Sequence, residues 1–299
     1  MLSSAIARAW SETHPSDEVI RLTRADADLT DAAATRAMLE RVRPDLLIHA
    51  AAKVGGIAAN MADPTAFLMD NILIDSSVLR AATDLGLGRV LYIGSSCMYP
   101  RDYRQPLVEG DILAAPLEPT NEGYALAKIV AAKYCEYASD QLGFDYRVII
   151  PSNLYGPGDD YASGTSHLVA AAIAKTHAAR EAGSAAVEVW GDGTARREFT
   201  FVEDVAQWIA SSAAGMHDWP ALMNVGAGHD HSVLDFYQLA ARATGWAGEF
   251  DLQPDRPAGM HQKLMDSSVA ATFGWSPSTT LEDGMRIAYD AFLAARTGK

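Results

Sequence analysis

The chain has 299 residues, of which 49% are hydrophobic and 21% are charged, and 38 acidic against 24 basic residues give a formal charge of -14. This length suits one large domain or two coupled domains, and the moderate charge with ordinary apolar content excludes a disordered chain. A strongly acidic chain repels phosphate backbones, so nucleic acid is not an expected partner. The sequence also lacks a membrane span of ~20 apolar residues and a secretory signal. Its two cysteines, Cys97 and Cys135, do not make a disulfide framework or a metal cluster. We therefore expect a soluble cytoplasmic protein without a metal site.

The N-terminal segment predicts a helix that ends at Pro15. Its apolar residues recur at the spacing of one helical face: Leu2, Ala5, Ile6, Ala9 and Trp10. A dinucleotide-binding fold opens with a strand and a glycine-rich turn before such a helix, whereas the first glycine of this chain is Gly55. We therefore expect the first strand and the phosphate-binding turn of the fold to be missing.

Beyond this helix, short runs of β-branched and other apolar residues alternate with longer segments. The predicted strands are Val19–Thr23, Leu46–Ala50, Val90–Ile93 and Val148–Ile150. The predicted crossover helices are Asp31–Arg41, Pro64–Leu85 and Tyr124–Leu142. Continuous apolar strands are buried on both faces, which indicates a parallel sheet in an α/β fold. Because ligands bind at the carboxyl ends of such strands, the residues directly after each run are the candidate site.

The alternation changes near Pro157 and becomes irregular after Asn224. We therefore predict a Rossmann-like, doubly wound domain and a smaller, interleaved substrate-binding domain. The first covers residues 1–157 with a return segment near 200–228, and the second covers 158–199 and 229–299.

The segment Tyr124-Ala-Leu-Ala-Lys128 is the most informative. On a helix these two polar residues share one face, and an ammonium group beside a phenol lowers the tyrosine pKa from its usual value of about 10. Tyr124 would then donate a proton to a ketone oxygen near neutral pH. Because the spacing also occurs in ordinary amphipathic helices, the segment alone leaves both interpretations open.

Two neighbouring segments favour the catalytic interpretation. A buried strand ends in Ser95-Ser96-Cys97, and a serine there, about thirty residues before the tyrosine, resembles the Ser-Tyr-Lys set of the short-chain dehydrogenase/reductases. The resemblance implies catalytic roles for Ser95, Tyr124 and Lys128. The segment Pro151-Ser-Asn-Leu-Tyr-Gly-Pro157 resembles the nicotinamide-flanking segment of the extended branch of that family. The cofactor contacts thereby implied are Lys128, Pro151, Asn153, Leu154 and His167.

Further segments resemble the GDP-L-fucose synthases, which are GDP-4-keto-6-deoxy-D-mannose 3,5-epimerase-4-reductases. These segments are Ala50-Ala-Ala-Lys-Val-Gly-Gly-Ile57, Gly94-Ser-Ser-Cys-Met-Tyr-Pro100, Leu117-Glu-Pro-Thr-Asn-Glu-Gly-Tyr124, Ser166-His167 and Trp190-Gly-Asp-Gly-Thr-Ala-Arg-Arg-Glu-Phe199. The resemblance extends from the first residue to about Leu281. It implies conversion of the GDP-linked ketosugar to GDP-L-fucose by 3,5-epimerisation and then NADPH-dependent reduction at C4, in a cytoplasmic homodimer.

The implied epimerisation needs a base on one face of the sugar and an acid on the other, because the C4 ketone acidifies the hydrogens on C3 and C5. In this family a cysteine and a histidine have these roles, and they correspond to Cys97 and His167. A neighbouring cation can lower the usual thiol pKa of about 8.5, and histidine titrates close to physiological pH. From the residues alone, Cys97 could equally be a small buried hydrophobe and His167 a structural polar residue. Cys135 is expected to be structural.

For the reduction, the resemblance implies that Ser95 hydrogen-bonds the C4 oxygen while Tyr124 protonates it. Lys128 would hold the ribose and tune Tyr124. Ser95 and Tyr124 would also stabilise the enolate formed during epimerisation.

Arg24 directly follows the predicted strand Val19–Thr23 and bears on the choice of cofactor. An arginine at this place accommodates the 2′-phosphate of NADP, whereas NAD sites usually carry an acidic residue. The pair Asp28-Leu29 resembles the adenine-contacting pair of the extended family. A solvated surface charge is the alternative for Arg24, and we favour NADP.

The substrate-binding residues also follow from the resemblance. Arg197 corresponds to the phosphate-binding arginine of the R-E-F motif, and its guanidinium fork suits phosphate. Lys263 corresponds to a position near the nucleotide-sugar, and Lys175 falls where many relatives have arginine. Trp190 is expected to stack on the sugar pocket or to form part of the core.

Two alternatives remain. The first is another nucleotide-sugar epimerase or 4-ketoreductase of the same family, since the nucleotide base cannot be derived from these residues. The second is a catalytically silent nucleotide-binding protein, because the expected absence of the glycine turn would remove a phosphate site. Against the second stands the joint presence of Ser95, Cys97, Tyr124, Lys128 and His167.

Overall fold

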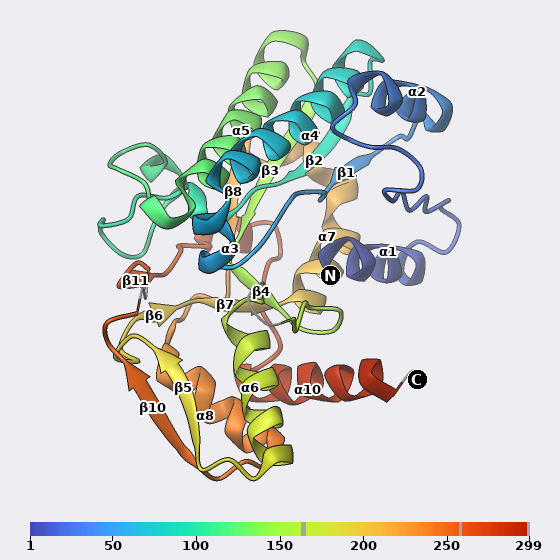
Figure 1. Cartoon of the computed structure of the whole chain (residues 1–299). Helices are drawn as coiled ribbons and strands as arrows, with labels where there is room; N and C mark the ends of the chain where they lie inside the picture. Colours follow the sequence, from blue (N-terminus) through green and yellow to red (C-terminus); the bar gives the residue numbers. More distant parts are fainter. Residues whose placement is uncertain (163–165, 257–258, 298–299) are drawn as a thin grey trace.

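A four-stranded parallel sheet forms the centre of the upper part of the molecule in Figure 1. The computed structural model describes residues 1–162, 166–256 and 259–297. The sheet has the order β1-β2-β3-β8, and its strands are β1 (Leu47–His49), β2 (Arg89–Ile93), β3 (Asp145–Pro151) and β8 (Leu222–Val225). The predicted strands Leu46–Ala50 and Val90–Ile93 match β1 and β2 to within one residue, Val148–Ile150 lies inside the longer β3, and β8 lies within the predicted return segment.

Helices cover both faces of this sheet, as a doubly wound fold requires (Figure 1). One face carries α2 (Ala32–Val42), α4 (Pro64–Asp84) and α5 (Glu122–Leu142), and the other carries α1 (Leu2–Thr13) and α7 (Val202–Ser212). Successive strand residues point to opposite faces. In β2, Val90 and Tyr92 therefore join the first core, whereas Leu91 and Ile93 join the second. The predicted Rossmann-like fold is confirmed.

The helix bounds have local causes. The Asp31 carboxylate accepts hydrogen bonds from two backbone N–H groups in the first turn of α2 and so caps that helix. Asp63 caps α4 in the same way, and Pro64 occupies the first turn, where its missing N–H costs nothing. Gly143, with a φ of 69°, ends α5 in the left-handed conformation that glycine adopts most readily.

The predicted strand Val19–Thr23 is wrong, because residues 18–23 adopt no regular secondary structure. An extended segment becomes a strand only when its backbone groups pair with a neighbour. Within the described residues β1 pairs with β2 alone, and nothing pairs with residues 19–23. Ile20 is accordingly 47% exposed. The short apolar run resembled a buried strand, but none of its side chains is fully buried, and Leu22 only packs against the edge of the core.

A smaller set of elements forms the lower part of the molecule in Figure 1. Its strands are β4 (Asn153–Tyr155), β5 (Ala186–Trp190), β6 (Arg196–Arg197), β7 (Phe199–Phe201), β9 (His231–Ser232), β10 (Glu249–Gln253) and β11 (Gln262–Lys263). Its helices are α6 (Leu168–Ala182), α8 (Val233–Thr244) and α10 (Leu281–Thr297). The chain also has short helices that connect the elements named so far, in either part of the molecule. They are α3 (Ile57–Ala62), α9 (Ser268–Ala271), η1 (Ser96–Met98), η2 (Glu109–Asp111), η3 (Pro119–Asn121) and η4 (Ala213–Asp218). An aromatic-rich core, including Phe199, Phe236 and Tyr289, holds this part together.

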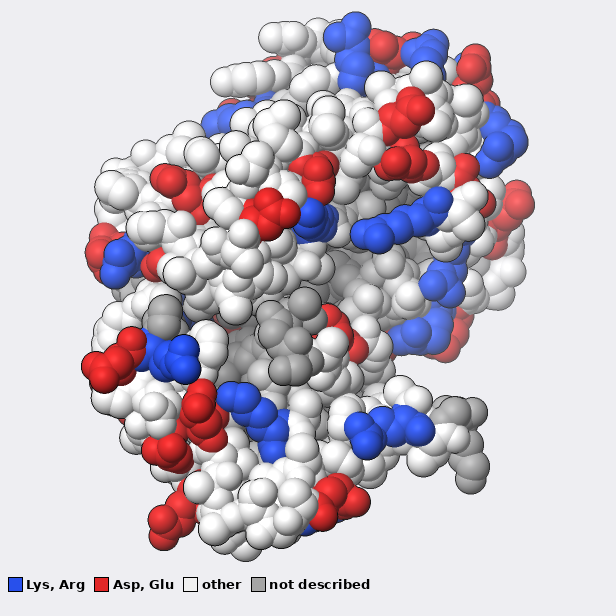
Figure 2. Space-filling view, viewed as in Figure 1, with Lys and Arg blue, Asp and Glu red and all other residues white. Residues whose placement is uncertain are grey.

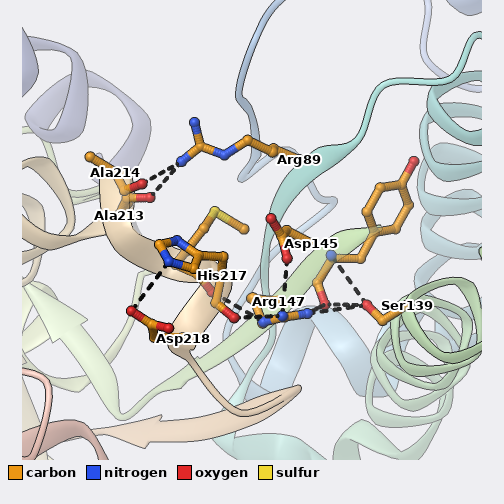
Figure 3. Close-up of polar contacts among 10 residues, drawn as sticks. Arg89, Ser139, Asp145, Arg147, Ala213, Ala214, His217 and Asp218 are labelled. Carbon is orange, nitrogen blue, oxygen red and sulfur yellow. Dashed lines mark hydrogen bonds and ion pairs between the residues drawn. The ribbon is translucent and has the colours of Figure 1, made fainter. Parts of the chain in front are cut away.

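Two arginines tie the sheet to η4 (Figure 3). Arg147 on β3 donates hydrogen bonds to the carbonyl oxygens of Met216 and His217, each at 3.1 Å. Arg89 on β2 donates to the carbonyl oxygens of Ala213 and Ala214. These carbonyl groups end a helical segment and need partners outside it.

The space-filling view in Figure 2 shows acidic and basic side chains interspersed over one face, with the surface hollowed between the upper and lower parts. None of the helices within the described residues is both long enough and apolar enough to cross a membrane.

Candidate active site

The loop after β2 carries the predicted serine and cysteine. Ser95 precedes η1, and its hydroxyl oxygen accepts a hydrogen bond from the Cys97 backbone N–H at 3.2 Å. Gly94 allows this turn to approach β3, because a Cβ atom there would lie only 3.2 Å from the Ile149 carbonyl oxygen. Both Ser95 and Cys97 are half-buried, so their side chains remain accessible.

Helix α5 brings Tyr124 and Lys128 to the same end of β2. Lys128 is 2% exposed, and its ammonium group donates a hydrogen bond to the Ile93 carbonyl oxygen at 3.1 Å. The ammonium nitrogen lies 6.0 Å from the centre of the Tyr124 ring and 4.5 Å from the centre of the Tyr92 ring. These residues thus meet at the carboxyl edge of the sheet, where α/β folds bind ligands.

The pKa of Tyr124 differs from the expectation. Burial raises this pKa above its usual value, nearby Cys97 adds to the rise, and a hydrogen bond with Ser95 opposes it. The prediction that the Tyr124 pKa lies below its usual value is wrong for this structure, because burial is the largest influence on this pKa and raises it. The Lys128 ammonium group, 6.0 Å from the centre of the phenol ring, donates its hydrogen bond to the Ile93 carbonyl oxygen. Tyr124 is therefore a neutral phenol with a proton to donate.

Two donors face the sulfur atom of Cys97. The Asn121 side-chain amide donates to this sulfur at 3.2 Å, and the Lys263 ammonium nitrogen lies 3.9 Å from it. Lys263 also donates to the Ser96 hydroxyl oxygen at 3.2 Å and is 7% exposed. Reactive cysteines occupy surroundings of this kind, with a cation nearby. Lys263 was predicted as a substrate-binding residue, and the structure places it against Cys97.

His167 precedes the first turn of α6. Its side chain remains open to solvent, yet the surrounding protein atoms are close enough to lower its pKa, and positively charged Lys263 lowers this pKa further. Lys263 therefore lies within electrostatic reach of both residues predicted for epimerisation. The expectation that His167 and Cys97 belong to one site fits this arrangement.

Arg197 lies beside Lys263, because β6 and β11 pair in parallel with these two residues in register. Burial lowers the Arg197 pKa, while the charges of Glu118 and Cys97 act in the opposite direction. Two cations on adjacent strands can each contact an oxygen of a diphosphate.

The other predicted residues lie in three places. Lys175 and Trp190 meet at Glu188, since Lys175 donates to its carbonyl oxygen at 3.0 Å and the Trp190 indole N–H donates to its carboxylate at 2.7 Å. The 37% exposure of Trp190 excludes the alternative that it is core material. The remaining residues are Pro151 at the end of β3, Asn153 and Leu154 in β4, and Arg24, Asp28 and Leu29 in the segment before α2.

Sequence reasoning missed two polar residues. Asn121 lies three residues before Tyr124 in a segment that was noted only for its resemblance, and its amide is directed at Cys97. Asp75 is 2% exposed on α4 and lies 3.9 Å from the Lys128 ammonium nitrogen. An aspartate directly after the apolar residues Ile72–Ile74 of a sheet-covering helix was the available signal.

These elements define a nucleotide-dependent α/β enzyme, and residues 1–226 match the NAD dependent epimerase/dehydratase family, to which the chain belongs. Among its relatives is the GDP-L-fucose synthase of Azorhizobium caulinodans, which is 45% identical over 276 residues, 92% of this chain and 88% of the relative. The GDP-L-colitose synthase of Yersinia pseudotuberculosis is 40% identical over 277 residues, 92% of this chain and 90% of the relative. The resemblance to GDP-L-fucose synthases is thus confirmed.

A solved structure supports the same fold. The GDP-L-fucose synthetase from Naegleria fowleri bound to NADP superposes with a TM-score of 0.86. The match covers 99% of this chain and 90% of that structure at 23% sequence identity.

Proposed function

We propose that the protein converts GDP-4-keto-6-deoxy-D-mannose to GDP-L-fucose by 3,5-epimerisation followed by NADPH-dependent reduction at C4. The observation that carries this proposal is the position of Cys97, whose sulfur atom contacts Asn121 and Lys263 and which lies near Ser95 and Tyr124. Proton-transfer and reduction groups therefore meet in one site. The resemblance of the whole chain to GDP-L-fucose synthases supports the choice of substrate.

In the epimerisation, Cys97 and His167 exchange protons with C3 and C5. Lys263 and Asn121 place hydrogen-bond donors at the Cys97 sulfur atom, and Lys263 favours the neutral form of His167. Ser95 and Tyr124 donate hydrogen bonds to the C4 oxygen, where the enolate charge develops. This arrangement allows proton removal without a strong free base.

For the reduction, a dinucleotide bound at this site would supply the hydride that C4 accepts. Tyr124 gives its proton to the C4 oxygen, and Ser95 holds that oxygen in place. The high Tyr124 pKa keeps the proton on the phenol until the alkoxide develops. Lys128 stabilises the phenolate that remains after transfer.

The residues present fit a dinucleotide. An ammonium group has three N–H donors, and Lys128 uses one for the Ile93 carbonyl, which leaves others for ribose hydroxyls. Asn153 and Leu154 follow the end of β3, and Arg24 is exposed beside Asp28. We therefore assign the ribose to Lys128, the nicotinamide side to Pro151, Asn153, Leu154 and His167, and the adenosine side to Arg24, Asp28 and Leu29.

For the substrate, we assign the diphosphate to Arg197 and Lys263. Lys175 and Trp190, which meet at Glu188, are assigned to the outer part of the nucleotide-sugar. Arg256 lies over the Trp190 ring, with its guanidinium carbon 5.4 Å from the ring centre, so this area offers both a cation and an aromatic surface. We propose two domains on this basis. Residues 1–157, with the return segment near 200–228, bind NADP, and residues 158–199 and 229–299 bind the sugar nucleotide.

A homodimer formed through α4 and α5 completes the proposal. These neighbouring helices expose apolar side chains, namely Met69, Leu73, Leu126, Val130 and Tyr137. Exposed apolar groups gathered on adjacent helices favour association with a second copy. We also propose a cytoplasmic location, which the free thiols of Cys97 and Cys135 support.

The test uses the purified protein with the GDP-linked ketosugar in deuterium oxide. We expect NADPH oxidation, a GDP-L-fucose product and deuterium at C3 and C5. Cys97→Ser should slow deuterium exchange at both carbons while reduction of an already epimerised ketone continues, and Cys135→Ser is the matched control. Equal loss of both reactions in Cys97→Ser would contradict the separate roles.

The same assay distinguishes the alternatives. Turnover of a different GDP-linked ketosugar with no reaction of this substrate would favour another epimerase or 4-ketoreductase, for which the GDP-L-colitose synthase relative is the specific support. Nucleotide binding without exchange or NADPH oxidation would favour a catalytically silent protein.

A further inference from the structure

A cluster of polar side chains is buried between the sheet and the helices behind Tyr124. It consists of His49 on β1, Tyr92 on β2, Asp75 on α4 and Lys128 on α5, and each residue is at most 3% exposed. The surrounding layer is otherwise made mainly of apolar side chains. A buried charged group in such a layer needs a partner.

Asp75 occupies the centre of this cluster. One of its carboxylate oxygens lies 2.9 Å from the His49 ring nitrogen, and the other accepts a hydrogen bond from the Tyr92 hydroxyl at 2.6 Å. The Lys128 ammonium nitrogen lies 3.9 Å from this second oxygen. Both oxygens are thus held in place, and the carboxylate provides the counter-charge for the lysine.

Lys128 and Asp75 each influence the charge of the other. Burial lowers the Lys128 pKa, and Asp75 acts in the opposite direction. Burial acts to raise the Asp75 pKa, yet this pKa lies below its usual value, because the hydrogen bonds with His49 and Tyr92 and the charges of Lys128 and His49 together outweigh burial. The titratable groups that face Lys128 are Asp75 from α4, Tyr92 from β2, and Tyr124 and Cys135 from α5, with His49 from β1 behind Asp75.

We propose that Asp75 is a positioning residue for the reduction step: its carboxylate holds the Lys128 ammonium group charged and in place beside Tyr124, and His49 and Tyr92 hold the carboxylate. This inference rests on the proposed role of Lys128. When Tyr124 gives up its proton, the adjacent positive charge stabilises the phenolate. Without Asp75, the buried ammonium group loses its proton at lower pH, and this stabilisation is lost.

The decisive variant is Asp75→Asn in the full chain, with two activities measured from pH 6 to pH 10. NADPH oxidation reports the reduction, and deuterium exchange at C3 and C5 without NADPH reports the epimerisation. We expect the kcat of NADPH oxidation to fall about tenfold or more, which corresponds to about 1.4 kcal/mol for each factor of ten, and its alkaline limb to move to lower pH. Deuterium exchange should change little, because Tyr124 keeps its proton while it hydrogen-bonds the enolate, so no phenolate forms that needs the Lys128 charge. Asp70→Asn, at an exposed position of the same helix, is the matched control.

A lower kcat with an unmoved alkaline limb, or an equal loss of exchange and oxidation, would overturn the inference. Asp75→Glu retains the charge and should restore the alkaline limb. If Asp75→Asn does not fold, Tyr92→Phe decides, since it removes one bond to the carboxylate: a smaller shift of the limb in the same direction supports the inference, and a wild-type profile refutes it. A wild-type protein without exchange or oxidation would instead refute the proposed function.

Discussion

Glu198 makes the stability of this protein depend on pH in an unusual direction. It is 1% exposed, and its carboxylate accepts hydrogen bonds from the backbone N–H groups of Gly228 at 2.7 Å and Met265 at 3.0 Å. Burial nevertheless raises its pKa from 4.5 to about 7. The folded protein therefore binds this proton more tightly than the unfolded chain does. The resulting stability is fully present below about pH 4.5 and is lost as the pH rises through about 7.

The shift of about 2.5 pKa units corresponds to roughly 3 kcal/mol, at about 1.4 kcal/mol for each unit. We expect Glu198→Gln to remove this dependence. The free energy of unfolding of the wild type minus that of Glu198→Gln should therefore decrease by roughly 3 kcal/mol between pH 4.5 and pH 8. Urea unfolding at a series of pH values measures this difference, and Glu249→Gln, at an exposed position, is the control. Parallel pH curves for the wild type and Glu198→Gln would refute the reasoning.

Two further substitutions test the cofactor assignment and the fold. Arg24→Ala should remove a charge-assisted contact worth about 1.5–3 kcal/mol and so raise the Kd for NADPH about tenfold or more. The Kd for NADH should remain unchanged in this variant. In the control Arg36→Ala, the Kd values for NADPH and for NADH should both remain unchanged. A wild-type protein that prefers NADH would contradict the assignment. Arg147→Ala should lower the free energy of unfolding by about 2–3 kcal/mol, because it leaves the Met216 and His217 carbonyl groups without this donor (Figure 3). Arg286→Ala removes only exposed ion pairs and should change it by less than about 1 kcal/mol, so similar melting of these two variants would argue against a structural role for Arg147.

The sequence predicted those parts of the fold in which local pattern and burial agree. The runs that became β2 and β3 are apolar because both faces of the sheet are covered, and α4 and α5 were found within two residues of their bounds. Val19–Thr23 has a similar composition, yet it is no strand because pairing depends on a neighbour that a local pattern does not report. The helix Leu2–Thr13 was predicted correctly because its apolar face alone specifies it.

The site residues divide in the same way. The resemblance pointed to Cys97 and Lys128, but the polar side chains of Asn121 and Asp75 beside them were not assigned a role. Asn121 and Asp75 act across elements, and their partners are fixed by packing that has no signature in sequence spacing. The expected lowering of the Tyr124 pKa failed for a similar reason, since burial, which spacing does not report, is the largest influence on this pKa. Spacing on a helix determines which side chains share a face but does not determine which atoms they contact.

The separate origins of these partners show how one site can serve two reactions. Cys97 is held by Lys263, which comes from β11 in the lower part of the molecule, whereas Lys128 is held by Asp75, which comes from α4 in the upper part. The proposed epimerisation group thus depends on contact between the two parts, and the proposed reduction group depends on the upper part alone. The sulfur atom of Cys97 and the phenol of Tyr124 consequently lie near different cations, Lys263 and Lys128. A proton can then move at C3 and C5 without discharging the lysine that the later reduction at C4 requires.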